Sequence, residues 1–298
     1  MKRLYILFLS VCAAMVSSCN IDEVITEPMP ESVIFEVCDY TPAPGQFIGD
    51  MKTAGFDGSE STAQAAIAYA QRRLDSGLFV SLGAFGGYIT VRSSCAVANG
   101  EGYDFIVAGN AFANSSEPGI VWVMQDENGN GVADDTWYEL AGSETGLEDT
   151  IAEYEVTYYR PAEAECSVAW SDNLGGSGEV EYLGAFHSQA SYYPQWITAE
   201  CYTLKGTRLK SRSYDKAGDG SQWINPAFDW GYADNASAVD GANRENLFDI
   251  SNARNAMGEA VVLEHIDFIK VQSAIQQQCG RIGEVSTDVA GFKIVDNE

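Results

Sequence analysis

The sharpest chemical motif in this sequence is a run of oxygen-bearing side chains at Asp126–Asp135. Counted from Asp126, an Asp or Asn stands at positions 1, 3, 5 and 9, and Gly131 stands at position 6. Calcium takes about six to eight oxygen ligands from such a tight loop, and the glycine permits its sharp bend. The loop therefore predicts a structural calcium ion. The expected ligands are Asp126, Asn128, Asn130, the backbone carbonyl of Val132, Asp134 and Asp135.

The loop departs from the usual calcium pattern at position 12. Trp137 stands where a bidentate acid is expected, so Asp135 or Glu139 would have to complete the coordination shell. The alternative is an Asn-Gly-rich hairpin that binds no ion.

A second group of residues suggests a ligand site in the irregular stretch 205–258. Flat aromatic faces beside Asp and Asn suit a neutral, hydroxyl-rich ligand such as a sugar, or the edge of a large planar cofactor. The expected ligand-binding residues are Trp223, Trp230, Tyr232 and Asp234. The alternative is that these aromatic residues fasten long loops onto the domain, because aromatic side chains bury readily.

The sequence nominates no catalytic residue. It contains two histidines, and His265 stands in the stretch 263–267 on an expected strand, where a hydrogen-bonded structural role is expected. No nucleophile elbow, zinc-protease motif or phosphate loop occurs. With 43 acidic residues, some carboxylate pairs must form, so a polysaccharide-degrading enzyme stays open as an alternative.

The elements that position these residues are mostly short strands separated by Gly, Asn and Asp. Residues 119–125 have two apolar faces and should form a central strand. The other expected strands are 79–91, 103–108, 137–140, 154–159, 195–204, 261–271 and 291–295. One helix is expected at 61–76, with Ser61 as its cap and Gly77 at its end. The fold class is mainly β: one β-sandwich or jelly-roll domain with a short helix near its N-terminal side.

The first residues predict where the protein works. Lys2 and Arg3 precede an apolar run that is too short to span a bilayer, and small residues then lead to Cys19. This pattern indicates a lipoprotein signal peptide at 1–18 and lipidation of Cys19; an ordinary signal peptide is the alternative. An acidic, Pro-rich tether is expected at 19–48, and the β domain at 49–298. Within the tether, the short apolar piece 33–37 could form a first strand or an edge strand.

Charge and cysteine content narrow the possible partners. Without residues 1–18 the chain keeps 15 basic and 43 acidic residues, a net charge of −28, which repels nucleic acid and anionic lipid headgroups. No other segment approaches the length of a membrane span, so the lipid is expected to be the only membrane anchor. Export permits disulfides among the five remaining cysteines, but an odd number leaves at least one thiol free. They are Cys38, Cys95, Cys166, Cys201 and Cys279.

Several motifs resemble known families. The Asp126 loop resembles the calcium loops of dockerins and thrombospondin type 3 repeats, and the acids behind Cys19 resemble the surface-export signal of Bacteroidota-type lipoproteins. Residues 266–271 with 283–285 are similar to the closing strands of galactose-binding-like jelly rolls, as in discoidin and carbohydrate-binding modules. The chain also resembles a family of bacterial cell-surface lipoproteins, mostly of unknown role. The segments that carry this resemblance are 82–89, 103–112, 116–121, 137–144 and 229–235.

These resemblances imply nutrient capture, because some relatives accompany outer-membrane transporters for glycans or corrinoids. The expected function is a surface-exposed, outer-membrane lipoprotein that binds a nutrient, a glycan first of all, as an accessory to a TonB-dependent transporter. Capture of a corrinoid such as vitamin B12 is the nearest variant. A surface polysaccharide-degrading enzyme and an adhesin are the alternatives from other classes.

Overall fold

The computed structural model describes residues 33–187 and 189–295, in a compact unit that begins at Val33. The predicted signal peptide, Cys19 and the first part of the predicted tether lie outside the described residues. In the described part of the chain, no helix is long and apolar enough to cross a membrane.

The predicted tether at 19–48 is wrong in its last part, which is folded into the domain. Strand β1 (Phe35–Thr41) pairs antiparallel with β3 (Tyr88–Ala98) at the edge of a sheet, and Tyr40 is 1% exposed. Pro42 and Pro44, whose type suggested an extended linker, are buried. Burial of this segment in the core moves the domain boundary from residue 49 to Val33.

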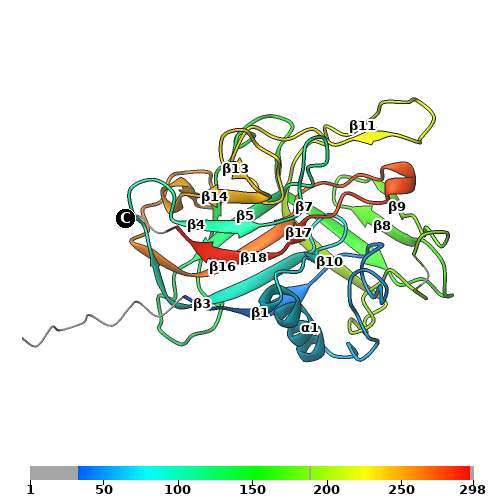
Figure 1. Cartoon of the computed structure of the whole chain (residues 1–298), viewed down its shortest axis with the longest axis horizontal. Coiled ribbons are helices and arrows are strands. Elements are labelled where there is room, and N and C mark those ends of the chain that lie inside the picture. Colours follow the sequence, from blue (N-terminus) through cyan, green and yellow to red (C-terminus); the bar gives the residue numbers. More distant parts are fainter. Residues whose placement is uncertain (1–32, 188, 296–298) are drawn as a thin grey trace, which may run out of the picture. The chain divides into compact units, whose positions relative to one another are not determined.

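Two antiparallel sheets form a β-sandwich, as predicted. The first has the order β1–β3–β16–β5–β6–β15, with β16 (His265–Ser273), β5 (Gly119–Met124), β6 (Trp137–Leu140) and β15 (Ala253–Arg254). The second has the order β13–β14–β4–β18, with β13 (Gly241–Ala242), β14 (Glu245–Phe248), β4 (Phe105–Ala108) and β18 (Gly291–Ile294). Val121 and Ile269 of the first sheet share one buried core with Phe105 and Val107 of the second. Figure 1 shows β4 and β18 beside β16 and β3.

The expectation of a central strand at residues 119–125 is confirmed. β5 lies between β16 and β6, and both of its faces are apolar. Val121 and Val123 belong to the sandwich core, whereas Ile120 packs on the other side of the sheet with Leu209 and Phe228. A strand covered on both faces needs this kind of continuous apolar run.

A third antiparallel sheet extends the sandwich, shown in green to the right in Figure 1. It consists of β10 (Cys201–Arg208), β7 (Ile151–Tyr159), β8 (Val168–Asp172) and β9 (Ser177–Val180) in that order. Its own core includes Val156, Val168 and Leu204. Tyr158 joins this sheet to the rest of the domain, because its hydroxyl donates a 2.8 Å hydrogen bond to the carbonyl of Phe85.

The strand expected at 79–91 is broken in two. Its first part is β2 (Val80–Ser81), which pairs with β17 (Asp288–Val289), and its second part is the start of β3. Between them the chain turns so tightly that a Cβ on Gly87 would lie 1.8 Å from the Leu82 carbonyl oxygen. The stretch 205–258 holds only short strands after β10, such as β11 (Tyr214–Asp215) and β12 (Trp223–Ile224).

The predicted helix is present as α1 (Ala63–Asp75), which lies against β1 (Figure 1). Its cap is Thr62 rather than Ser61, since Thr62 Oγ1 accepts a hydrogen bond from Ala65 N at 3.2 Å. Gly77 follows the helix with a φ of +62°, a left-handed conformation that favours glycine. Ala66 and Ala70 are fully buried, as the 3.6-residue period predicts.

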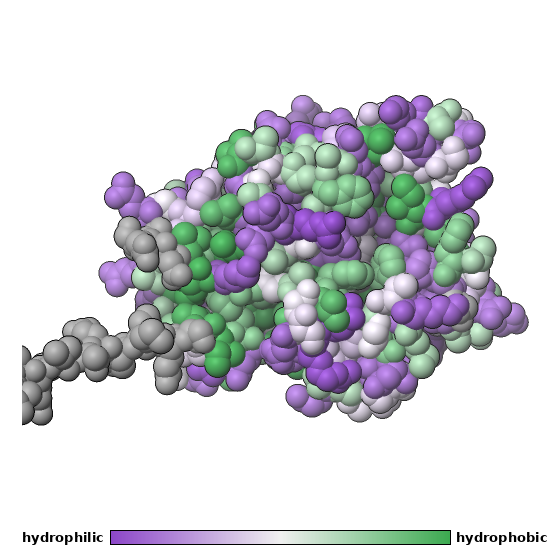
Figure 2. All heavy atoms as spheres, in the orientation of Figure 1, coloured by the Kyte–Doolittle hydropathy of each residue, from purple (hydrophilic) through white to green (hydrophobic). Residues whose placement is uncertain are grey.

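The surface in Figure 2 mixes hydrophilic and hydrophobic residues, with hydrophobic ones gathered around the end of β18. An open groove of about 590 Å³ there is lined in part by Ile34, Phe35 and Phe292. The five described cysteines are all free thiols, and Cys279 is the buried one. The prediction that at least one thiol stays free is therefore confirmed.

Candidate functional site

Strand register places five side chains from five strands in one row across the six-stranded sheet. From β1 to β6 they are Asp39, Thr90, Lys270, Trp122 and Glu139. Directly paired residues of adjacent antiparallel strands share a face, about 5 Å apart. The row lies on the face away from the sandwich core, because Ile269 and Val271 on either side of Lys270 point into that core.

A pocket of about 490 Å³ opens over the part of this row from Asp39 to Lys270; we call it the Lys270 pocket. Its walls come from four strands of the sheet, β1, β3, β16 and β6, and from the Asp126–Asp135 loop. The lining residues that matter for its chemistry are Asp39, Tyr88, Thr90, Val132, Trp137 and Lys270. Its size falls in the range of small-molecule sites, about 300–1,000 Å³.

Aromatic rings surround the ammonium group of Lys270. Its Nζ lies 4.5 Å from the ring centroid of Trp137, 5.1 Å from that of Trp122 and 5.9 Å from that of Tyr88. Each distance is within the range of a cation–π interaction. Burial against these rings lowers the pKa of Lys270 to about 8, and the nearby Asp39 carboxylate opposes that shift.

Two cations at this site lack a carboxylate partner among the described residues. Neither Lys270 nor Arg92 takes part in an ion pair, although six other basic side chains do. Arg92 is close to the pocket wall, because its Nη1 lies 2.8 Å from where a Cβ on Gly131 would stand.

Both carboxylates of the row are held by hydroxyl groups. Asp39 accepts hydrogen bonds of 2.9 Å from the hydroxyls of Tyr88 and Thr41. Glu139 accepts one from the Thr207 hydroxyl; burial raises the pKa of Glu139 to about 7, and this hydrogen bond opposes the rise. The row is thus a fixed framework of polar groups with Lys270 at its centre.

The predicted calcium loop forms one wall of the Lys270 pocket through Gly131, Val132 and Ala133. Gly131 has a φ of +72°, so the predicted sharp bend at the sixth position is confirmed. Asp126 stabilises that bend by accepting hydrogen bonds from Asn130 N at 3.1 Å and Gly131 N at 2.8 Å.

The remaining predicted ligands converge on two carboxylates. The Nδ2 of Asn128 donates to Asp134 at 3.1 Å and to Asp135 at 3.2 Å, and the Nδ2 of Asn130 also donates to Asp134. No group of three or more His, Cys, Asp or Glu placed to hold a metal ion occurs among the residues that the structure describes. The donor set consists entirely of the hard oxygens that calcium prefers, so it fits the ion chemically. Binding would require both amide groups to turn their Nδ2 atoms away.

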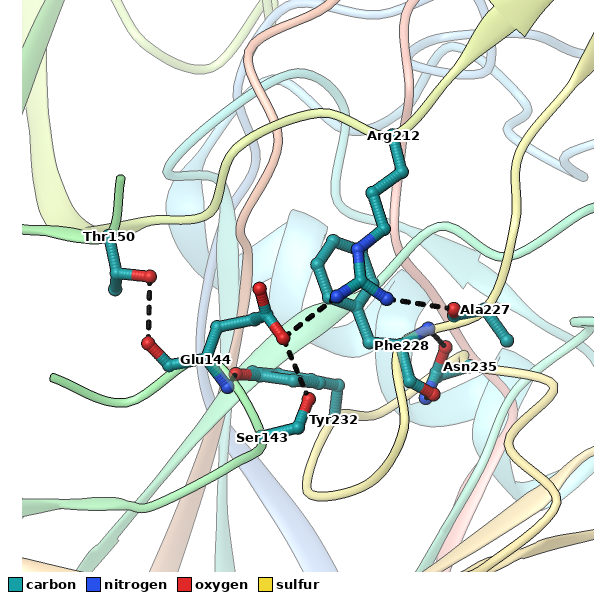
Figure 3. Close-up of polar contacts among 8 residues, drawn as sticks. All are labelled: Ser143, Glu144, Thr150, Arg212, Ala227, Phe228, Tyr232 and Asn235. Carbon is teal, nitrogen blue, oxygen red and sulfur yellow. Dashed lines mark hydrogen bonds and ion pairs between the residues drawn. The ribbon is translucent and has the colours of Figure 1, made fainter. Parts of the chain in front are cut away.

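Tyr232, one of the four predicted ligand-binding residues, is a buried structural residue. Its side chain is 1% exposed, and its hydroxyl accepts a 2.9 Å hydrogen bond from Glu144 N. Figure 3 shows Arg212 over the Phe228 ring, reaching Glu144 and the Ala227 carbonyl. Here the aromatic side chains fasten the irregular stretch to the domain, which was the alternative expectation.

Asp234 is also a buried residue, which favours a structural role over the predicted ligand contact. It is 0% exposed, and its carboxylate accepts hydrogen bonds from Asn110 N and Ala111 N at 2.8 Å and from Asp288 N at 2.9 Å. Burial raises its pKa, against the effect of these three bonds. Trp223 and Trp230 are half-buried, and Trp223 packs against the core that contains Tyr232.

A second, smaller pocket of about 220 Å³ lies between the third sheet and residues 276–284. Its lining includes Trp170 of β8, Glu179 of β9 and the buried Glu284. Glu284 Oε1 accepts a hydrogen bond from Gln46 N at 2.8 Å, and Oε2 has no partner among the described residues. Burial raises the pKa of Glu284 to about 7. Two acids and an indole ring thus share one pocket.

The sequence did contain a signal for the Lys270 pocket. Lys270 is a charged residue inside the otherwise apolar run Phe268–Val271, within the strand expected at 261–271. A lysine there must reach solvent or a partner, because an unpaired buried charge is costly. Its neighbours Tyr88 and Trp137 come from distant strands, so sequence spacing does not reveal them.

Comparison with known proteins adds no relative: no protein-family model matches the chain, and no curated protein matches it.

Proposed function

We propose that this chain is a non-catalytic surface lipoprotein that captures a nutrient glycan for a TonB-dependent outer-membrane transporter. The observation that supports this most is the Lys270 pocket, where Trp137 and Tyr88 adjoin polar groups on a rigid sheet. Sugar rings present apolar C–H faces and hydroxyl edges, and they bind where aromatic faces and hydrogen-bonding groups stand side by side.

The proposed location rests on the N-terminal sequence. Lipidation of Cys19 after cleavage would anchor the chain, and the acids that follow it favour the outer face of the outer membrane. Metabolic labelling with a fatty-acid analogue tests this: the wild-type chain should be labelled and a Cys19→Ser variant should not. Protease treatment of intact cells should then degrade the chain, and full protection would exclude surface exposure.

Calcium has a proposed structural role in this function. An ion bound by the Asp126–Asp135 loop would stiffen the loop that forms one wall of the Lys270 pocket. Ligand binding should therefore be stronger with calcium than with a chelator. If calcium alters neither affinity nor thermal stability, the loop is a plain hairpin and the pocket works without an ion.

The binding function is tested with the purified chain on a glycan array and with cyanocobalamin, each with and without calcium. Trp137→Ala should abolish glycan binding. Trp230→Ala is the matched control, because both indoles are half-buried but Trp230 does not line the pocket. If only Trp230→Ala loses glycan binding, the ligand site lies in the irregular stretch 205–258 and not in the Lys270 pocket. Binding of cyanocobalamin alone would favour the corrinoid variant, and no binding at all would favour an adhesin.

A second candidate function, polysaccharide hydrolysis, rests on the smaller pocket. A glycosidase uses two carboxyl groups, one of them a general acid with a raised pKa, and Glu179 and Glu284 offer such a pair beside Trp170. Release of reducing ends from polysaccharides would support hydrolysis if both Glu284→Gln and Glu179→Gln abolish it. Activity that survives both substitutions would exclude this pocket as the active site.

A further inference from the structure

The lining of the Lys270 pocket contains one cation, Lys270, and one carboxylate, Asp39, and the two side chains form no ion pair with each other. Lys270 has aromatic rings on three sides, and among the described residues it forms no ion pair. Arg92 stands unpaired beside the same wall. The nearest carboxylate, Asp39, is already hydrogen-bonded by Tyr88 and Thr41.

We propose that the Lys270 pocket binds the carboxylate of a uronic acid residue, with the sugar ring against Trp137. This inference rests on the proposed glycan-binding function and names the class of sugar. The carboxylate of the sugar would contact the Lys270 ammonium group and lie within reach of the Arg92 side chain. Asp39 and Thr90 line the same pocket and would form hydrogen bonds with the ring hydroxyls.

Desolvation makes this ion pair selective. A partly buried ammonium group has lost water, so a charge-assisted hydrogen bond to a carboxylate gains more there than on the open surface. An uncharged sugar would leave the ammonium without that bond. Non-specific attraction does not explain an acidic ligand, because the chain has a formal net charge of −26 and repels anions at long range.

The test compares oligogalacturonate with its methyl ester, in which one methyl group replaces the charge of each carboxylate; both are titrated calorimetrically into the full chain at pH 7. We expect the acid to bind at least about tenfold more tightly than the ester, the effect of one well-placed charged hydrogen bond. Lys270→Gln should abolish this preference, and Lys270→Arg should keep most of it. Thermal melts show whether each variant is folded.

The pH dependence provides a second readout that a merely structural lysine would not give. The preference for the acid should fall between pH 7 and about 9.5, as Lys270, with a pKa of about 8, loses its proton. Burial holds the pKa of Cys38 at about 11 and that of Tyr88 at about 12, so both stay neutral in this range. Glu139 has a pKa of about 7 and is mostly ionised above it. The other charged groups near the pocket are Asp39 in its lining, Arg92 beside Gly131, and the four acids of the loop, Asp126, Glu127, Asp134 and Asp135.

The outcomes separate this inference from the proposed function. Equal affinity for acid and ester, or a preference that survives Lys270→Gln, would overturn the uronic acid proposal and leave glycan capture in place. If neutral glycans bind on the array and oligogalacturonate does not, the proposal is also overturned. If no glycan of either kind binds, both fail.

Discussion

The backbone N–H of Asp126 donates a 2.8 Å hydrogen bond to Oδ2 of Asp267, which ties the start of the predicted calcium loop to β16. Asp267 stands on β16 close before Lys270. One hydrogen bond thus joins the loop that walls the Lys270 pocket to the strand that carries its cation. The order of the loop and the shape of the pocket are linked through this contact.

Removing that acceptor should loosen the loop. We expect Asp267→Ala to lower the free energy of unfolding by about 1 kcal/mol, since a hydrogen bond to a charged group is lost at a partly exposed site. Amide exchange at residues 126–135 should speed up more than elsewhere. Asp267→Asn keeps an acceptor oxygen and should behave much like wild type. Equal exchange in all three proteins would contradict the link.

Calcium should raise the thermal stability of the chain. With a dissociation constant on the order of 10⁻⁴ M, typical of extracellular sites, 10 mM calcium adds about 2.7 kcal/mol, or roughly 5–10 °C in Tm. Differential scanning calorimetry in calcium and in chelator measures this. Replacing Asp134 and Asp135 together by Asn should remove the response, and a wild-type Tm that is the same in both buffers would exclude the ion.

Stability should fall as the pH rises from about 4.5 to about 7. Burial raises the pKa of Glu139 from 4.5 to about 7, so the folded state binds more protons than the unfolded state across this window. Stability then declines with pH, and the loss is complete above the folded-state pKa. Burial also raises the pKa of Glu284 to about 7, and this acts in the same direction.

A pair of matched variants isolates the contribution of Glu139. Glu139→Gln should flatten the fall in Tm between pH 4.5 and pH 7.5, because the buried group no longer titrates. Glu101→Gln removes the same charge from an exposed position and controls for the change in net charge. If both variants follow the wild-type curve, Glu139 is not a source of the pH dependence.

Asp234 should be essential for stability rather than for ligand binding. Asp234→Ala removes the acceptor of three backbone N–H groups in the interior, so we expect a loss of about 3 kcal/mol or more in urea denaturation. The exposed Asp229→Ala should change stability by less than about 0.5 kcal/mol. An Asp234→Ala protein with wild-type stability and lost ligand binding would restore the original role predicted for this residue.

Local patterns were sufficient for much of the fold. The 3.6-residue period located the helix, and the continuous apolar run identified β5 as a central strand. The glycine at the sixth position of the Asp126 loop predicted its bend. Each of these features depends on residues that are close in sequence, so residue spacing alone is sufficient to predict it. The third sheet was not predicted. A first or edge strand was considered at 33–37, but not the burial of Pro42 and Pro44 that follow it, because packing between distant segments decides both.

The candidate site shows the same division more sharply. Aromatic density drew attention to Tyr232 and Asp234, but burial depends on what packs over a side chain, and both proved to be interior. The sequence pattern did not single out Lys270 as a site residue, because the aromatic rings around it come from β3, β5 and β6. The sequence by itself determined the mainly β class, the acidic charge and the predicted lipid attachment at Cys19. Only the tertiary structure decided which residues meet, because strand register, set by packing of the whole core, aligns Asp39, Thr90 and Lys270.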